Sequence, residues 1–326
     1  MTLLANSSIG QALTALQSQG LERLDAQLLL LHVLGIAPTQ RGWLLAHDTD
    51  PLPSQCSPTL QALALRRAQG EPLAYLTGSK AFYGLALHVT PDVLVPRPDT
   101  ETLVDWALEV LPDCHQAMTG ATPQQANHLA SPAPHVLDLG TGSGAIALAL
   151  KATRSALQMW ATDQSAAALA VAKANAQRLQ LEVSFSQGAW LAALPADAPA
   201  FDCIVSNPPY IAEHDPHLAA LTFEPTQALT SGADGLDDLR QIIASAPAHL
   251  QPGGWLLLEH GYDQATAVRQ LLSQSGFDQV QSRKDLAGLA RCTGGQNPLI
   301  PDTLGHGLSG ARQPTDNLQP LTSHSP

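Results

Sequence analysis

The stretch 136–144, VLDLGTGSG, decides the fold. An apolar run carrying one acid, Asp138, leads through a glycine-rich loop into the apolar, alanine-rich stretch 145–152, which is typical of a helix. Strand, loop and helix in this order form the opening unit of a parallel α/β sheet. Ligands of such sheets bind beyond the carboxyl ends of the strands, so the loop marks a candidate ligand site.

The pattern of alternating strands and helices continues from residue 135 to residue 276. Strands are predicted at 135–140, 157–163, 181–187, 201–207 and 254–261, and helices at 144–152, 165–179, 236–250 and 264–276. Strands separated by helices predict a doubly wound, mostly parallel sheet with right-handed crossovers.

A smaller helical domain is predicted at 1–73, before this sheet. Within it, Leu21, Leu24, Leu28 and Leu31 recur at helical spacing, and a further helix follows a cap at Ser57. The other boundaries are a β-hairpin linker at 74–98 that turns at 90–92, a catalytic domain at 99–296 with a loop insertion at 112–134, and a disordered tail at 297–326.

Composition narrows the function classes. The chain has 326 residues, 16 Lys+Arg against 28 Asp+Glu and a net charge of −12, which disfavours binding to phosphate backbones. Its four cysteines form no C-x-x-C pair and its histidines show no metal-ligand spacing, so neither disulfides nor a metal site is expected. Without a signal peptide or a run of about 18 apolar residues, we expect a cytoplasmic protein with no membrane contact.

The glycine spacing separates two kinds of ligand. Gly140, Gly142 and Gly144 let a ligand approach the backbone, but position 145 is Ala where the dinucleotide fingerprint has glycine. A pyrophosphate would also be repelled by Asp138. A cationic ligand with an amino-acid end, such as S-adenosylmethionine, would tolerate it. Asp163, at the end of the second strand, is placed to accept hydrogen bonds from ribose hydroxyls, although it could instead cap the following helix.

The second decisive motif is Asn207-Pro208-Pro209-Tyr210, which ends the fourth predicted strand beside the first. Methyl transfer to a planar nitrogen needs that nitrogen held in line, roughly 3 Å from the methyl carbon. The Asn207 side-chain oxygen and the Pro208 carbonyl would accept from the NH₂ group, and the prolines would hold these acceptors rigidly. Tyr210 would offer a flat face to the planar group.

Together these motifs resemble the peptide chain release factor N5-glutamine methyltransferases, of the class I S-adenosylmethionine-dependent enzymes. The similarity covers about residues 8–296 and includes RRAQGEPLAYLTG, VPRPDTETLV, DLGTGSGAIALAL, SNPPYI and LLLEHG. It implies a seven-stranded sheet, a helical domain that recruits the release factor, and methylation of the glutamine in that factor's Gly-Gly-Gln loop. Asn207 to Tyr210 would contact the glutamine. The cofactor contacts it implies are Asp138, Gly140, Thr141, Gly142, Ser143, Gly144, Asp163, Trp190 and Asn207.

Two other methyltransferases share the motif. One methylates a ribosomal protein's glutamine, but that family lacks the PRPDTE form found at 96–101. A DNA adenine N6-methyltransferase would flip its base against Tyr210, yet the acidic composition argues against the basic groove that such an enzyme needs. A non-enzymatic binding module is the third possibility. The chain's own Gly294-Gly295-Gln296 is interpreted as chance in a loop rather than as a site of self-methylation.

Ala189 departs from the family pattern, in which an acid precedes the tryptophan at 190. Such an acid would accept from the adenine amino group. We therefore predict that Ala189→Asp tightens cofactor binding, by about 1 kcal/mol for the added hydrogen bond. Isothermal calorimetry with S-adenosylmethionine checks this, and an unchanged affinity contradicts it.

The tail and the 112–134 insertion are rich in polar residues and proline, and their apolar residues show no helical or strand periodicity. We predict that both are dispensable. Removing residues from 300 onward should leave methyl transfer at the full-length rate, measured with labelled cofactor. Loss of activity in the trimmed chain would show that the tail takes part.

Overall fold

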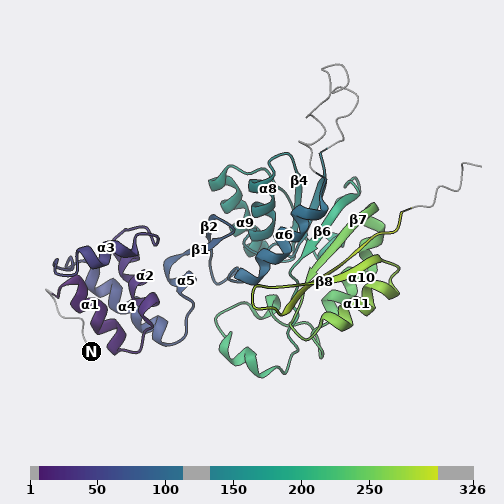
Figure 1. Cartoon of the computed structure of the whole chain (residues 1–326). Helices are drawn as coiled ribbons and strands as arrows, with labels where there is room; N and C mark the ends of the chain where they lie inside the picture. Colours follow the sequence, from purple (N-terminus) through teal and green to yellow (C-terminus); the bar gives the residue numbers. More distant parts are fainter. Residues whose placement is uncertain (1–6, 113–132, 300–326) are drawn as a thin grey trace, which may run out of the picture.

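The computed structural model describes residues 7–112 and 133–299 (Figure 1). The chain opens with helices that bury leucines and isoleucine in a core of their own. Their bounds are α1 Ile9–Ser18, α2 Arg23–Val33, α3 Arg41–Ala46, α4 Cys56–Ala68 and α5 Leu73–Thr77. Ser8 caps α1 by accepting from Gln11 N at 3.2 Å, while the Gln11 side chain accepts from Ser8 N at 2.9 Å.

The helix predicted from the spacing of the leucines is confirmed as α2, but the prediction for the start of α4 is wrong. In α2, Leu24 is 46% exposed whereas Leu29, Leu30 and Leu31 are fully buried, because neighbouring helices pack against α2 from more than one side. Ser57 is not a cap, since α4 already begins at Cys56 and has no side-chain cap. In α2, tertiary packing sets which side of the helix is buried.

The predicted hairpin exists, but its turn was misplaced. Strand β1 Ser79–Phe82 pairs with β2 Leu85–His88 around Tyr83-Gly84, both of which have positive φ. The segment 93–95 is not a strand, because side chains rather than a neighbouring strand satisfy its backbone. Val93 O accepts from the Tyr75 hydroxyl at 2.6 Å, and Val95 N donates to Glu224 at 3.1 Å.

The second part of the chain is built on a seven-stranded sheet in the order β5-β4-β3-β6-β7-β9-β8. Strands β3 to β7 pair in parallel and β9 runs antiparallel between β7 and β8, which confirms the predicted fold class. The bounds are β3 His135–Leu139, β4 Gln158–Asp163, β5 Ser184–Gln187, β6 Phe201–Ser206, β7 Leu250–Glu259, β8 Asp278–Lys284 and β9 Ala290–Gln296.

The prediction that Gly294-Gly295-Gln296 lies in a loop is wrong. The tripeptide is part of β9, with Gly294 opposite Leu257 and Gln296 opposite Trp255. A Cβ on Gly294 would lie 2.5 Å from the Leu257 side chain, so the close approach of the strands requires glycine there.

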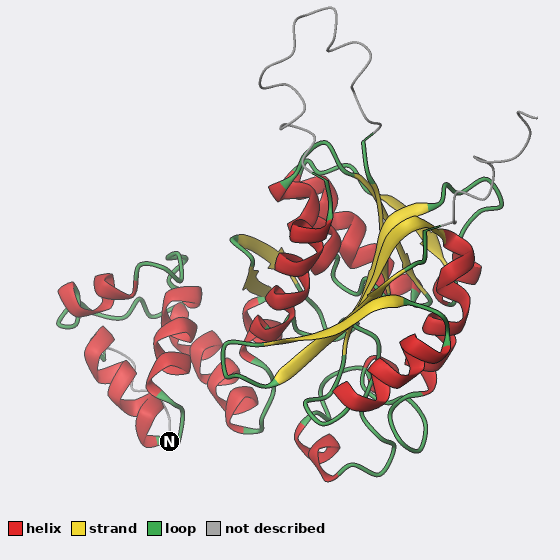
Figure 2. Cartoon of the chain, turned by 45° about the vertical axis from the view of Figure 1, so that its right-hand side comes forward, coloured by secondary structure: helices red, strands yellow, loops and turns green. Residues whose placement is uncertain are grey.

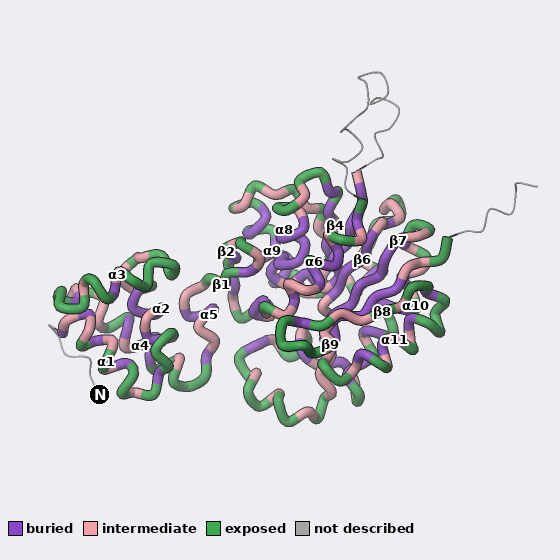
Figure 3. Tube along the Cα trace, in the orientation of Figure 1, coloured by how far each residue is buried: buried purple, intermediate pink, exposed green. Residues whose placement is uncertain are grey.

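Helices cover both faces of the sheet (Figure 2). One core packs α6, α8 and strand residues such as Val205 and Leu257, and the other packs α10, α11 and residues such as Ile204 and Leu258. Successive strand residues therefore point to opposite cores, and the central strands are buried on both sides (Figure 3). The helix bounds are α6 Glu101–Val110, α8 Ala145–Thr153, α9 Ala166–Leu179, α10 Asp237–Ser245 and α11 Ala265–Gln274, with 3₁₀ turns η1 Pro98–Thr100, η3 Trp190–Ala193, η4 Pro216–Ala220, η5 Thr226–Ala228 and η6 Ala246–His249.

One buried side chain ties the hairpin to the glycine loop. Asn175 on α9 accepts from His88 N at 2.7 Å and donates to His88 O at 2.9 Å and to Ser143 O at 3.0 Å. The hairpin and the glycine loop are thus fixed to the same helix.

Across 7–112 and 133–299, no helix is long and apolar enough to cross a bilayer.

Candidate active site

The site begins where β3 and β6 end side by side. Leu139 pairs with Ser206, and the Ser206 hydroxyl donates to Leu139 O at 2.7 Å. The glycine loop leaves β3 at Gly140, and the Asn-Pro-Pro-Tyr motif leaves β6 at Asn207. The predicted adjacency of the two motifs is therefore confirmed.

The glycine loop is shaped by positive φ values and by Asp138 beneath it. Gly140 has φ +69°, and a Cβ there would lie 3.0 Å from the Trp190 ring. Asp138 is fully buried; its Oδ2 accepts from the Thr141 hydroxyl at 2.6 Å and from Ala147 N at 3.2 Å. Burial raises the pKa of Asp138 to about 7, and its Oδ1 has no partner among the described residues.

Asp163, at the end of β4, faces the loop. Its carboxylate accepts from Gly142 N and from Ser165 N, both at 2.9 Å. The cap of α9 is Ser165, which accepts from Ala168 N at 3.2 Å, so Asp163 supports this turn without being the cap itself. Burial raises the pKa of Asp163. Each carboxylate oxygen can accept more than one bond, so capacity for ribose hydroxyls remains.

Asn207 carries the feature that most clearly indicates a bound nitrogen. Its Nδ2 donates to the Thr100 hydroxyl at 3.3 Å, while its Oδ1 is buried without a hydrogen-bond partner among the described residues. A buried acceptor left unpaired is costly, and Asn207 lines the pocket, so this side chain is a candidate to accept from a ligand. Burial also raises the pKa of Tyr210, which keeps its phenol neutral.

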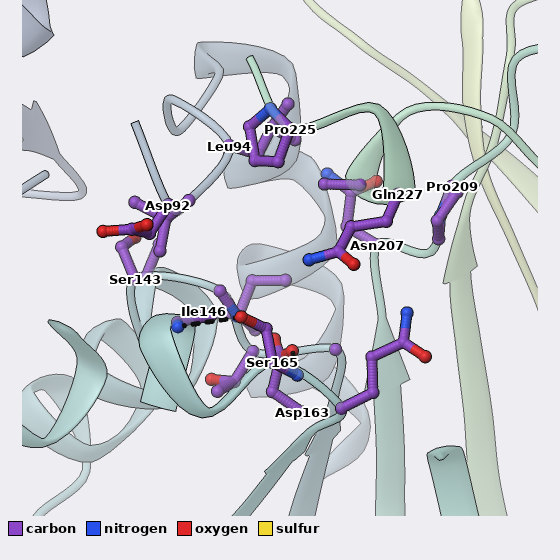
Figure 4. Close-up of a pocket in the computed structure, with 18 of the residues that line it drawn as sticks. Asp92, Leu94, Ser143, Ile146, Asp163, Ser165, Asn207, Pro209, Pro225 and Gln227 are labelled. Atoms are coloured by element: carbon purple, nitrogen blue, oxygen red, sulfur yellow. Dashed lines mark hydrogen bonds between the residues drawn. The ribbon is translucent and has the colours of Figure 1, made fainter. Parts of the chain in front are cut away.

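A pocket joins these residues (Figure 4). In this view Asn207 and Pro209 lie on one side, and Asp163 and Ser165 lie below them. Of the predicted site residues, those that line it are Gly140, Thr141, Gly142, Ser143, Asp163, Trp190, Asn207 and Pro209. A second pocket adjoins the first and is lined by Tyr210, Leu94, Arg97, Asn207, Ile211, Leu221, Ala228 and Leu229.

Three predicted residues lie behind the pocket surface. Asp138 and Pro208 are buried and line neither pocket, and Gly144 lies at the start of α8. Trp190 lies over Gly140 and donates from Nε1 to Asp238 at 3.1 Å, which fixes its ring at the pocket edge. Ala189 also lines the pocket, so an acid introduced there would face the ligand.

The sequence did not predict that segments outside the sheet form one wall of the pocket. Residues from Asp92 to Thr100 and from Pro225 to Ala228 close the pocket above the glycine loop. Buried Glu224 joins these segments by accepting from Val95 N and from the Arg97 guanidinium. The stretches RPDTE and FEP, which hold these charged residues, are the sequence signal that could have indicated the wall.

Comparisons with known proteins agree with this geometry. The family described as methyltransferase small domain matches residues 114–281, and the PrmC N-terminal domain matches 9–78. Release factor glutamine methyltransferase of Bordetella pertussis is 50% identical over 282 residues, 86% of this chain and 97% of that protein. The Burkholderia pseudomallei enzyme of the same name is 46% identical over 87% of this chain and 95% of that protein.

The chain belongs to the release factor glutamine methyltransferase family. It is thus an S-adenosylmethionine-dependent methyltransferase. Among solved structures, the catalytic domain of hMettl16 in complex with MAT2A 3′UTR hairpin 1 aligns with a TM-score of 0.50 at 14% identity, covering 76% of this chain and 81% of that chain. At this identity the alignment shows the fold alone.

The pocket of this methyltransferase fits the cofactor. Asp163 brings a carboxylate to the pocket, and Asp138 lies buried beneath the glycine loop with its Oδ1 unpaired, an arrangement suited to a ligand with a sulfonium and an ammonium group. Arg97 is the sole basic side chain among the pocket-lining residues. The residues present therefore suit a cationic cofactor better than a pyrophosphate.

Buried acids give this methyltransferase a pH-dependent stability. Burial raises the pKa of both Asp138 and Glu259 to about 7, so the folded state holds protons that the unfolded chain releases at about pH 4. The stabilisation is complete below pH 4 and is lost as pH rises to about 7. We predict that Glu259→Gln is more stable than the wild type at pH 8, by about 1–3 kcal/mol.

Urea unfolding at pH 5 and pH 8 checks this prediction. Exposed Glu109, paired with Arg283 on the domain surface, supplies the matched control Glu109→Gln, which should keep the wild-type difference between the two pH values. Equal stability of wild type and Glu259→Gln at pH 8 would contradict the expectation.

Proposed function

We propose that this protein transfers a methyl group from S-adenosylmethionine to the side-chain amide nitrogen of the glutamine in the Gly-Gly-Gln loop of peptide chain release factors. The observation that carries the proposal is made at Asn207, a residue that lines both adjoining pockets and whose buried Oδ1 has no partner among the described residues. An acceptor in that position suits a substrate that brings N–H donors. Relatives 41–50% identical to this chain carry the corresponding name.

The cofactor would occupy the pocket at the glycine loop. Gly140 to Gly144 would offer backbone approach, Asp163 would accept from ribose hydroxyls and Trp190 would pack against the ligand beside Gly140. When bound, S-adenosylmethionine supplies an electrophilic methyl group on a positively charged sulfur. Asp138, beneath the loop, would stabilise the positive end of the ligand through its free oxygen.

The substrate amide would enter from the second pocket, beside Tyr210. Asn207 Oδ1 would accept one of its N–H groups and so hold the nitrogen in line, whereas Pro208, predicted as the second acceptor, lines neither pocket. This acceptor favours pyramidal geometry and stabilises the positive charge that develops on the nitrogen. The Tyr210 ring would cover one face of the planar amide. No strong base is required, because the methylated cation loses its proton readily.

The proposal extends to the partner and the place of action. The helical region before residue 78 would recruit the release factor, leaving the glutamine free to reach Asn207. We place the reaction in the cytoplasm, without DNA or membrane as partner, on the composition of the chain. Ribosomal protein and DNA are the competing substrates to be tried beside the release factor.

Asn207→Ala should abolish most of the methyl transfer. We predict a fall in kcat of about 10²-fold or more, because a preorganised acceptor for the developing charge is lost. Transfer from labelled S-adenosylmethionine to purified release factor measures this, with a factor lacking the loop glutamine as the substrate control.

Asn297→Ala is the matched control variant. Asn297 donates to Leu250 O and Gln251 O at the far end of β7, so its loss tests general destabilisation without touching the pocket. Transfer that persists in Asn207→Ala, or that does not need the loop glutamine, would refute the proposed reaction. Transfer to ribosomal protein or DNA alone would keep the enzyme class and change the substrate.

A further inference from the structure

Glu259 ends β7 immediately beside the Asn-Pro-Pro-Tyr motif and lines neither pocket. Ser206 pairs with Leu258, so the next residues on the two parallel strands, Asn207 and Glu259, are neighbours. Glu259 is 1% exposed, and its Oε2 has no hydrogen-bond partner among the described residues. Burying a carboxylate costs free energy, so a stabilising role does not account for it.

A hydrogen bond between two side chains lies beside Glu259. Asn207 Nδ2 donates to the Thr100 hydroxyl at 3.3 Å, which leaves the Thr100 hydrogen free to donate onward. Thr100 and Asn207 both favour the charged form of the Glu259 carboxylate and so lower its pKa, against the larger effect of burial. A charged carboxylate only accepts, so Glu259, next to Asn207 on the neighbouring strand, favours donors on the side chains beside it. The nitrogen of Asn207 is the end that bonds to Thr100, and its oxygen is the end left without a partner among the described residues.

We propose that Glu259 is a positioning residue that, together with Thr100, fixes the Asn207 amide with its oxygen toward the substrate. This deepens the proposed function and rests on it. The two ends of an asparagine amide have almost the same shape, so packing alone does not choose between them. A rotated Asn207 would present its own NH₂ to the NH₂ of the substrate, and two donors would face each other. Glu259 thus selects for a nucleophile that carries N–H groups.

The charged and titratable groups around Glu259 lie on three further elements. Asp99 of η1 and Tyr210 after β6 lie near it, and Arg291 and Cys292 face it from β9. Arg291 favours the charged carboxylate but is also paired with Asp99 at 3.2 Å. Burial outweighs these effects and raises the pKa of Glu259 to about 7. Above that pH the carboxylate accepts; below it the protonated acid can donate, and the orientation of Asn207 is no longer imposed.

The first test needs no substrate. In protein labelled with ¹⁵N-asparagine, the side-chain amide signal of Asn207 is identified by its absence from Asn207→Ala. We expect this signal to titrate near pH 7 in wild type and to stay unchanged with pH in Glu259→Gln. A wild-type signal that does not move, or the same titration in Glu259→Gln, would overturn the proposal.

The second test is turnover. Glu259→Gln and Thr100→Val should lower kcat about 10- to 100-fold with KM for release factor within about twofold, as expected for lost orientation rather than lost binding. Thr100→Ser keeps the hydroxyl and should recover most of the rate, while exposed Glu109→Gln is the charge-matched control. Wild-type kcat in Glu259→Gln would refute the positioning role.

The two tests separate this inference from the proposed function. If wild type transfers no methyl to release factor, the proposed substrate is wrong, and the Asn207 titration still decides whether Glu259 orients the amide. Cofactor binding by calorimetry and the urea unfolding of each variant show whether a rate loss comes from misfolding. Wild-type turnover in Glu259→Gln would overturn the positioning role even if the Asn207 amide titrates, because the orientation would then have no catalytic consequence.

Discussion

The hydrogen bond from the Ser206 hydroxyl to Leu139 O, 2.7 Å long, joins the two chain segments on which the site depends. The ligand loop begins one residue after Leu139, and Asn207 follows Ser206 directly. Methyl transfer tolerates little error in the distance between nucleophile and methyl carbon. Two neighbouring strands in the centre of a sheet, buried on both faces, supply that rigidity, because neither can shift without disturbing both cores.

Two buried acidic side chains at this edge of the sheet lower the stability of the fold. Asp138 and Glu259 are almost completely buried, and each keeps one oxygen without a partner in the described residues. Asp138 supports the ligand loop, and Glu259 lies behind the Asn207 amide. Such groups weaken a fold at neutral pH, which is typical of residues retained for a function.

The sequence predicted the parts of the molecule that local chemistry determines. The glycine loop, the alternation of strands and helices, and the adjacency of Asn207 to the first strand follow from spacing and from the topology of parallel sheets. The hairpin was predicted wrongly because distant segments decide it: Tyr75 and Glu224 hydrogen-bond to the backbone at 93–95, which is not a strand, and the hairpin instead turns at Tyr83-Gly84. The role of Glu259 could not be predicted, since only the pairing of β6 with β7 brings it to Asn207.

Gly294-Gly295-Gln296 has the letters of the proposed target, yet it lies in a strand between two others. Gln296 sits opposite Trp255, at the edge of the sheet away from Asn207, and its amide donates to Gly253 O at 2.8 Å. A glutamine held in this way cannot present its nitrogen to a pocket. An enzyme of the proposed kind can therefore carry its own target sequence unharmed, because what it discriminates is the accessibility and shape of a loop rather than a string of residues.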